Sequence, residues 1–173
     1  MRENTPGRPP RSWKFVPSAG AMADPPSEPE STARAADENG EPVQSRELRI
    51  LLIEDSQPIK QRLASLLTEA GHMRVVASAT TEAEARAQIE AAEYDVLLVD
   101  VELREGSGIG AIRHARRFYP QGHQPLIIVL TNYPLPAVRT RCLEAGADHF
   151  LDKMRQFQDV KELVSAAPRL PRD

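Results

Sequence analysis

The sequence has few of the features that mark secreted, membrane-spanning or nucleic-acid-binding proteins. Its single cysteine, Cys142, excludes an intrachain disulfide and fits a reducing compartment. No stretch approaches the roughly 18 apolar residues that span a membrane, and the basic N-terminus lacks the apolar run of a secretory signal. The net charge is −3 and no basic run suggests a phosphate-reading surface. We therefore expect a cytoplasmic protein without membrane or nucleic-acid partners.

Aromatic residues are also scarce, at 5%, although hydrophobic residues reach 40%. A core must therefore be built mainly from aliphatic side chains. The length of 173 residues suffices for one ordinary domain but not for two.

The composition changes near residue 47. Residues 1–47 hold more than half of the 15 prolines, with many serines, alanines and acidic residues. Such a segment cannot bury enough apolar surface to offset its ordering entropy, so we predict a disordered N-terminal tail. Its apolar cluster of Trp13, Phe15 and Val16 is either a chance grouping or a short docking motif. Residues 168–173 are predicted to be a short C-terminal tail, with no output domain after the folded part.

From residue 48 onward, apolar runs typical of buried strands alternate with segments of helical periodicity. The runs cover residues 48–53, 74–78, 95–100, 126–130 and 149–151. One predicted helix begins near Pro58 and ends at Gly71, and another covers residues 81–92. The apolar faces of the last three comprise Ile109, Ile112, Ala115 and Phe118; Val138, Cys142 and Ala145; and Val160, Leu163, Val164 and Ala167.

This alternation predicts an α/β fold over residues 48–167. Strands that are apolar throughout belong to a parallel sheet covered by helices on both faces, which makes a three-layer sandwich. Crossover connections are right-handed almost without exception. The flavodoxin-like (βα)5 arrangement, with strand order 2-1-3-4-5, is the common solution at this size.

Polar side chains follow four of the five predicted strands. Glu54 and Asp55 follow the first strand, Asp100 ends the third, Thr131 follows the fourth, and Lys153 comes shortly after the fifth. In the order 2-1-3-4-5 these four strands are neighbours, and ligands bind beyond their shared carboxyl edge. We therefore predict that three carboxylates, a hydroxyl and an ammonium group meet there.

Three carboxylates at close range repel one another. At about 4 Å and an effective dielectric constant near 20, each pair costs roughly 4 kcal/mol. Three pairs would cost on the order of 12 kcal/mol, which is comparable to the stability of a whole domain. A cation relieves this repulsion, and oxygen ligands with open positions favour Mg²⁺, which also binds phosphate oxygens. A lysine and a hydroxyl nearby are suited to the remaining oxygens of a phosphoryl group.

These motifs, in this order, resemble the receiver domain of two-component response regulators. The resemblance extends over about residues 48–167. The matching segments are Glu54-Asp55, residues 95–100 with Leu103 and residues 106–108, Leu130-Thr131, and residues 145–153. Each motif alone is weak, but together, at these strand ends, they are specific.

The resemblance implies roles for individual residues. Asp100 would be the phosphoacceptor, Lys153 and the Thr131 hydroxyl would each bind a phosphoryl oxygen, and Phe150 would be an aromatic switch that turns inward when Thr131 moves. The ligands of Mg²⁺ would be Glu54, Asp55, Asp100 and the main-chain carbonyl of Glu102.

The resemblance also implies a function. The chain would accept a phosphoryl group from a sensor histidine kinase or a histidine phosphotransfer protein. It would take part in its own phosphorylation and dephosphorylation without being an enzyme for another substrate. A conformational switch would then pass the signal to a downstream protein.

The sequence departs from the family pattern at two loops. Met154 stands where the family often has a proline after the lysine, so we expect a trans peptide bond there. The segment 132–136 carries two prolines and should stiffen the start of the fourth helix. Glu102 and Tyr133 occupy positions that we hypothesise to tune the lifetime of the phosphoryl group.

Two other functions remain open at this point. The chain could be a receiver-fold module that binds a protein without phosphorylation, although its complete acidic set argues against this. It could also be a Mg²⁺-dependent nucleotidyl-transfer enzyme of the topoisomerase-primase type, which has an acid-x-acid pattern like Asp100-Val-Glu102. Lys153 and Thr131 favour the receiver. The four histidines show no metal-ligand spacing, and Cys142 is expected to be a small core residue.

Overall fold

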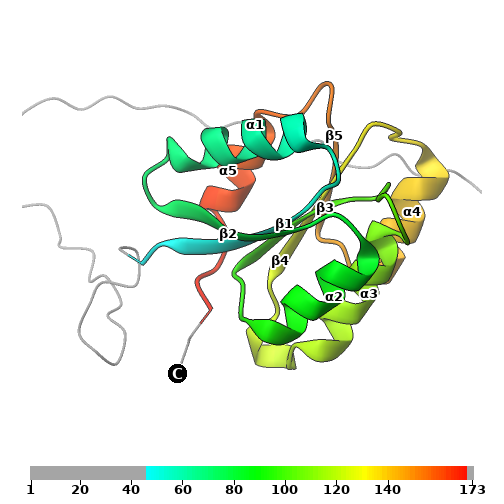
Figure 1. Ribbon diagram of the computed structural model, residues 1–173, viewed down its shortest axis with the longest axis horizontal. Coiled ribbons are helices and arrows are strands. Elements are labelled where there is room, and N and C mark those ends of the chain that lie inside the picture. Colours follow the sequence, from blue (N-terminus) through cyan, green and yellow to red (C-terminus); the bar gives the residue numbers. More distant parts are fainter. Residues whose placement is uncertain (1–45, 171–173) are drawn as a thin grey trace, which may run out of the picture. The chain divides into compact units, whose positions relative to one another are not determined.

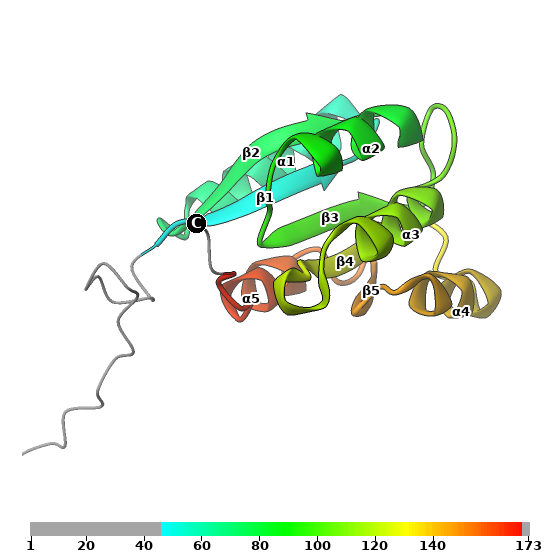
Figure 2. The same cartoon turned by 90° about the horizontal axis from the view of Figure 1, so that it is seen from below.

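The computed structural model describes residues 46–170, which form a five-stranded parallel sheet covered by helices (Figure 1; Figure 2). The strands are β1 (Leu48–Ile53), β2 (Met73–Ala79), β3 (Val96–Asp100), β4 (Leu126–Thr131) and β5 (His149–Asp152). The helices are α1 (Gln57–Thr68), α2 (Glu82–Ala91), α3 (Gly108–Phe118), α4 (Pro136–Ala145) and α5 (Asp159–Ser165), with a 3₁₀ turn at Gln121–His123. The strand order is β2-β1-β3-β4-β5, which confirms the predicted topology.

The pairing of the central strands fixes which residues share the carboxyl edge. Strand β3 lies between β1 and β4, and all five of its residues are buried. In register, Val99 lies beside Ile53, and Asp100 lies beside Leu130. The residues that follow Ile53 therefore emerge next to Asp100.

Two apolar clusters separate the sheet from its two helical layers. One contains Leu51, Leu97 and Val129 with the apolar faces of α2, α3 and α4. The other contains Ile50 and Leu98 with those of α1 and α5. Figure 1 shows α1 and α5 on one side of the sheet and α2 and α3 on the other. Because successive strand residues point to opposite faces, a strand covered on both sides must be apolar throughout.

Two side-chain caps and a glycine define ends of α2, α3 and α4. Thr81 caps α2 by accepting a hydrogen bond from Glu84 N at 3.1 Å. Ser107 caps α3 by accepting one from Ile109 N at 3.2 Å. Gly146 ends α4 with φ of 111°, a left-handed conformation that favours glycine. No cis peptide bond occurs in residues 46–170, in agreement with the trans bond expected after Lys153.

The prediction that Phe118 belongs to the buried face of α3 is wrong. Phe118 is 47% exposed, whereas Tyr119 is buried at 6%. The Tyr119 hydroxyl donates to the carbonyls of Ile89 and Ala92 at 3.2 and 2.9 Å. The chain leaves the helix after Phe118, so the tyrosine ring, not the phenylalanine ring, reaches under the end of α2.

The two ends of the described chain meet beside Asp95, which precedes β3 and is fully buried. Asp95 accepts hydrogen bonds from Arg49 N at 2.8 Å and Leu170 N at 3.1 Å, and it pairs with Arg46 at 3.5 Å. The Arg46 side chain also donates to the Leu170 carbonyl. We call this group the Asp95 clasp. Residues at both predicted tail boundaries thus contact the folded part.

Most of the predicted N-terminal tail, including Trp13, Phe15 and Val16, lies outside the described residues, and its disorder stays a prediction. Of that segment, the structure describes Arg46 and Glu47 alone. Within residues 46–170, none of the helices has the length and apolar character needed to cross a lipid bilayer.

Candidate functional site

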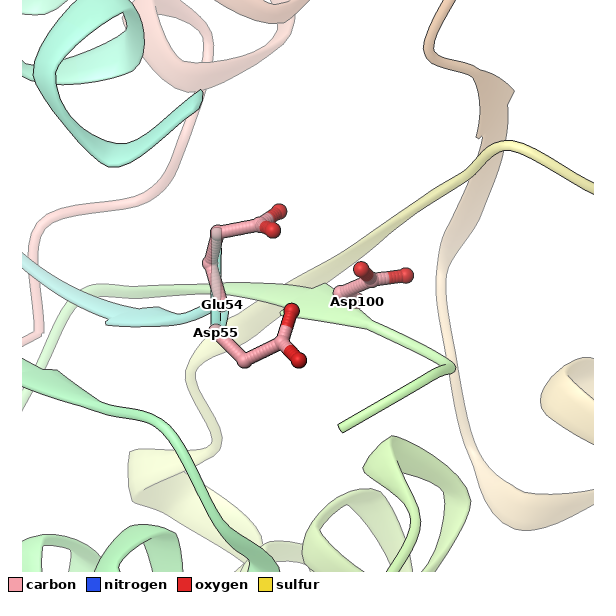
Figure 3. A group of neighbouring side chains, drawn as sticks. All are labelled: Glu54, Asp55 and Asp100. Carbon is pink, nitrogen blue, oxygen red and sulfur yellow. The ribbon is translucent and has the colours of Figure 1, made fainter. Parts of the chain in front are cut away.

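Three carboxylates gather at the carboxyl edge of the sheet (Figure 3). Glu54 and Asp55 follow β1, and Asp100 is the last residue of β3. One oxygen from each lies within 4.8 Å of the others, and no other such group of acidic, His or Cys residues occurs in the described part of the chain. Glu54 and Asp100 are buried, whereas Asp55 is exposed. The cluster is therefore open to solvent on the side of Asp55.

Lys153 lies between the two buried carboxylates. Its Nζ atom is 2.6 Å from Glu54 Oε2 and 2.5 Å from Asp100 Oδ2, and its side chain is 2% exposed. Its backbone N–H donates to the Thr131 carbonyl at 2.9 Å, which fixes the loop after β5 to the end of β4. One ammonium group thus faces two negative charges, so the site retains a negative excess to which Asp55 adds.

The electrostatics of Glu54 reflect this excess. Burial raises the pKa of Glu54, and the negative charge of Asp100 raises it further. The hydrogen bond and charge of Lys153, and a hydrogen bond from Ser56 N at 3.1 Å, act in the opposite direction. The net effect is a pKa above the ordinary value of 4.5. Added positive charge at this site would therefore be stabilising.

Thr131 lies on β4, which is next to β3, and Phe150 lies on β5, which is next to β4. Thr131 is buried, and its hydroxyl oxygen accepts a hydrogen bond from Tyr133 N at 3.1 Å. Phe150 pairs with Val129 in the sheet and packs, partly buried, against the cluster under α2, α3 and α4. The structure thus joins Thr131 to the loop that leads into α4. It places Phe150 one strand further along, on β5.

Glu102 belongs to the loop between β3 and α3. Its N–H donates to Asp100 Oδ1 at 3.3 Å, and it forms an isolated antiparallel bridge with Ser107. Gly108 closes this loop against Asp100, because a Cβ atom there would lie 1.9 Å from the Asp100 carbonyl oxygen. The loop backbone is thereby held next to Asp100.

Glu82, which the sequence did not single out, fastens the same loop to α2. Its Oε2 accepts from Ser107 N at 2.9 Å, and its N–H donates to the Glu105 carbonyl at 3.0 Å. A Cβ atom at Gly106, which has a positive φ of 79°, would lie 2.4 Å from the Glu82 Cβ, so glycine is required there. A Cβ atom at Gly110 would lie 2.1 Å from the Glu82 carboxylate and would displace it. The closely spaced glycines were the available sequence signal for this close approach.

The structure agrees with the prediction that Cys142 is a core residue, and it places His114 outside the acidic cluster. Cys142 is fully buried in α4, and burial raises the pKa of its thiol, as fits a small core residue. His114 lies 2.9 Å from Glu90 and stacks on Phe118.

A parallel sheet with an acidic cluster and a buried lysine at its carboxyl edge is the architecture of a receiver-type signalling domain. Residues 50–165 match the family of the response regulator receiver domain, and the chain belongs to this family. The predicted family and fold are thereby confirmed.

Individual relatives agree with this assignment. The chain is 29% identical over 117 residues to the photosynthetic apparatus regulatory protein RegA of Cereibacter sphaeroides, a match that covers 68% of this chain and 61% of RegA. It thus spans less than two thirds of that relative.

Two similar structures contain a divalent metal ion. One is the receiver domain of a sensor histidine kinase from Pseudomonas aeruginosa with a magnesium ion in its active-site cleft (28% identity, TM-score 0.60, covering 68% of this chain and 94% of that one). The other is a Burkholderia pseudomallei response regulator with a phosphorylated aspartic acid, a calcium ion and citrate (27% identity, TM-score 0.58, covering 71% and 67%).

Proposed function

We propose that the chain is a response regulator that accepts a phosphoryl group on Asp100 from a phosphohistidine of a sensor histidine kinase or a histidine phosphotransfer protein. The observation that carries this proposal is the contact of the Lys153 ammonium with both Asp100 and Glu54 inside a cluster of three carboxylates. Such a set of charges suits a divalent cation together with a phosphoryl group.

The cluster fits Mg²⁺. All its donors are hard oxygens, and Asp55 leaves one side exposed for water and phosphate oxygens. Two ligands of one Mg²⁺ are at most about 4.2 Å apart, since each lies about 2.1 Å from the ion, so a 4.8 Å cluster needs only small side-chain rotations. Glu54, Asp55, Asp100 and the Glu102 carbonyl would hold the ion. When bound, it would neutralise charge on the phosphoryl oxygens.

The transfer step assigns a task to each side chain. An Asp100 carboxylate oxygen forms a bond to phosphorus while the bond from phosphorus to the donor imidazole nitrogen breaks. The imidazole leaves with that electron pair and takes a proton from solvent. Lys153 exchanges its contact with Asp100 for one with a phosphoryl oxygen, and the Thr131 hydroxyl donates to another. Because Lys153 is already held within the cluster, little reorganisation is required.

The signal would leave the site through Thr131. Its hydroxyl accepts from Tyr133 N, so its movement toward the phosphoryl group would displace the loop before α4. Phe150 would turn inward as Thr131 moves. The face formed by α4, β5 and α5 would then bind a downstream protein, and a coupling free energy of about 1–3 kcal/mol would suffice. We expect this signalling in the cytoplasm, without membrane or nucleic-acid partners and without catalysis on another substrate.

Intact-mass measurement after incubation with Mg²⁺ and acetyl phosphate tests the proposal. We expect one added phosphoryl group on the wild type and none on Asp100→Asn. Asp152→Asn, which changes a carboxylate at the end of β5 outside the cluster, is the matched control and should be modified like the wild type. Absence of addition on the folded wild type would instead support a phosphorylation-independent protein-binding module.

A further inference from the structure

A second charged feature has none of Glu54, Asp55, Asp100 and Lys153 in its lining. Side chains of α2, α3 and α4 line an open groove of about 390 Å³. Among its lining residues are Glu82 and Arg86 from α2, Arg113, His114 and Arg117 from α3, and Arg141 from α4. We call it the arginine groove. The arginine groove could not be predicted from the sequence, because its four arginines come from three separate helices and the net charge is −3.

The cations of the arginine groove differ in whether they are already paired. Arg86 pairs with Glu82 at 2.6 Å, and His114 lies 2.9 Å from Glu90. Arg113, Arg117 and Arg141 are exposed and have no ion pair or hydrogen bond from their side chains to any residue in 46–170. The groove therefore presents three uncompensated guanidinium groups.

Neighbouring Arg116, unlike these three arginines, has its guanidinium group hydrogen-bonded within the fold. It donates to the carbonyls of Gly146 and Pro125 at 2.8 Å each, and to Asp148 at 2.6 Å. Arg113 and Arg117, by contrast, are four residues apart on the same helix, where like charges repel. The last turn of α3 gives Arg117 a favourable interaction with the helix dipole, but Arg113 and Arg141 have no such compensation. An external anion would supply the negative charge that compensates these two guanidinium groups.

The lining indicates which anion fits. Guanidinium groups bind carboxylates and phosphates through paired hydrogen bonds. Proteins that bind single-stranded nucleic acids usually stack bases on aromatic rings, yet among residues 46–170 no Phe, Tyr or Trp lines the groove. From Gly110 to Arg117 the groove follows α3 for about 10 Å, at ~1.5 Å per residue. An extended peptide covers that length with about three residues.

We propose that the arginine groove binds an acidic peptide segment of a partner protein, whose carboxylates pair with Arg113, Arg117 and Arg141. The groove shares α4 with the α4, β5 and α5 face invoked for signalling, but its other lining residues come from α2, α3 and the loop before α3. Peptide binding in the groove does not depend on phosphorylation of Asp100. The groove proposal can therefore fail while the phosphoacceptor function holds, and the phosphoacceptor function can fail while the groove proposal holds.

Fluorescence anisotropy with a fluorescein-labelled hexaglutamate peptide and the full chain tests this proposal at low ionic strength. We expect Arg141→Glu and Arg113→Glu each to weaken binding by about tenfold, which corresponds to about 1.4 kcal/mol. Arg139→Glu is the matched control, since it makes the same charge change at an exposed position of the same helix that does not line the groove. It should stay within about twofold of the wild type. Urea unfolding midpoints would verify that all three variants fold.

Three results would overturn the proposal. The first is no binding of hexaglutamate by the wild type. The second is equal weakening by Arg139→Glu and Arg141→Glu, which would indicate general charge attraction rather than the groove. The third is tighter binding of labelled oligothymidine with the same dependence on Arg113 and Arg141, which would make nucleic acid the ligand.

Discussion

Replacing Lys153 with methionine should destabilise the domain strongly, because it leaves Glu54 and Asp100 buried without their cation. The Lys153 and Glu54 side chains are each 2% exposed and that of Asp100 is 5% exposed, so solvent screens these charges little. Removing one partner of a buried ion pair typically costs about 3–5 kcal/mol. Against a total stability of about 5–15 kcal/mol, this is a large share. With a urea slope near 2 kcal/mol per molar, the midpoint should fall by about 2 M.

The loss should depend on pH in a defined direction. Lys153 lowers the pKa of Glu54 by its hydrogen bond and its charge, so the variant should have a Glu54 pKa raised even further above 4.5. A group whose pKa is raised on folding favours the folded state most at low pH, and this contribution is lost as pH rises through the folded pKa. The loss in free energy of unfolding caused by Lys153→Met should therefore be largest near pH 8 and become smaller toward pH 5.

Urea unfolding with EDTA present would measure both effects. Lys161→Met, which removes a lysine with no side-chain partner among the described residues, should change stability by less than about 0.5 kcal/mol. The double variant Lys153→Met with Glu54→Gln should recover about 1–2 kcal/mol, because one stranded charge is gone. A deficit under 1 kcal/mol, or one equal at pH 5 and pH 8, would refute the inference that Lys153 compensates buried charge.

Four other substitutions should have measurable effects. Tyr119→Phe should lower the free energy of unfolding by about 1–2 kcal/mol, because the Ile89 and Ala92 carbonyls, one buried and one part-buried, lose their donor. An unchanged urea midpoint would contradict this. Gly110→Ala should displace the Glu82 carboxylate, which lies 2.1 Å from the new Cβ, and weaken Mg²⁺ binding by about threefold, or ~0.7 kcal/mol, in a fluorescence titration. Tyr133→Ala and Glu102→Ala should each change the rate of phosphoryl loss by at least about twofold, equivalent to ~0.4 kcal/mol in the barrier. Rates equal to those of the wild type would contradict the hypothesis that these residues tune the lifetime of the phosphoryl group.

The strand order and the gathering of charges could be predicted because both follow from strand positions alone. Glu54, Asp55, Asp100 and Lys153 come together since parallel strands end at one edge, whatever the details of side-chain packing. The same reasoning placed Thr131 only approximately. Its hydroxyl is hydrogen-bonded to the loop before α4 and not to the acidic cluster.

Contacts between helices could not be predicted in this way. The periodicity that assigned Phe118 to the core fits Tyr119 almost equally well, and only the end of α3 decides between them. Glu82 reaches a loop some 25 positions later in the chain, and the arginine groove combines residues from three helices. Periodicity shows which face of a helix is buried, but it does not show which polar residues of separate helices meet.

The Asp95 clasp has a consequence for how the domain can be connected to other chains. It holds Arg46 next to Leu170 at the amino edge of the sheet, whereas the carboxylate cluster lies at the carboxyl edge. Both ends of the described domain therefore lie at the edge of the sheet opposite the carboxylate cluster. The domain could be spliced into a surface loop of a host protein, or circularly permuted by joining these ends, with the carboxylate cluster at the edge away from the junction.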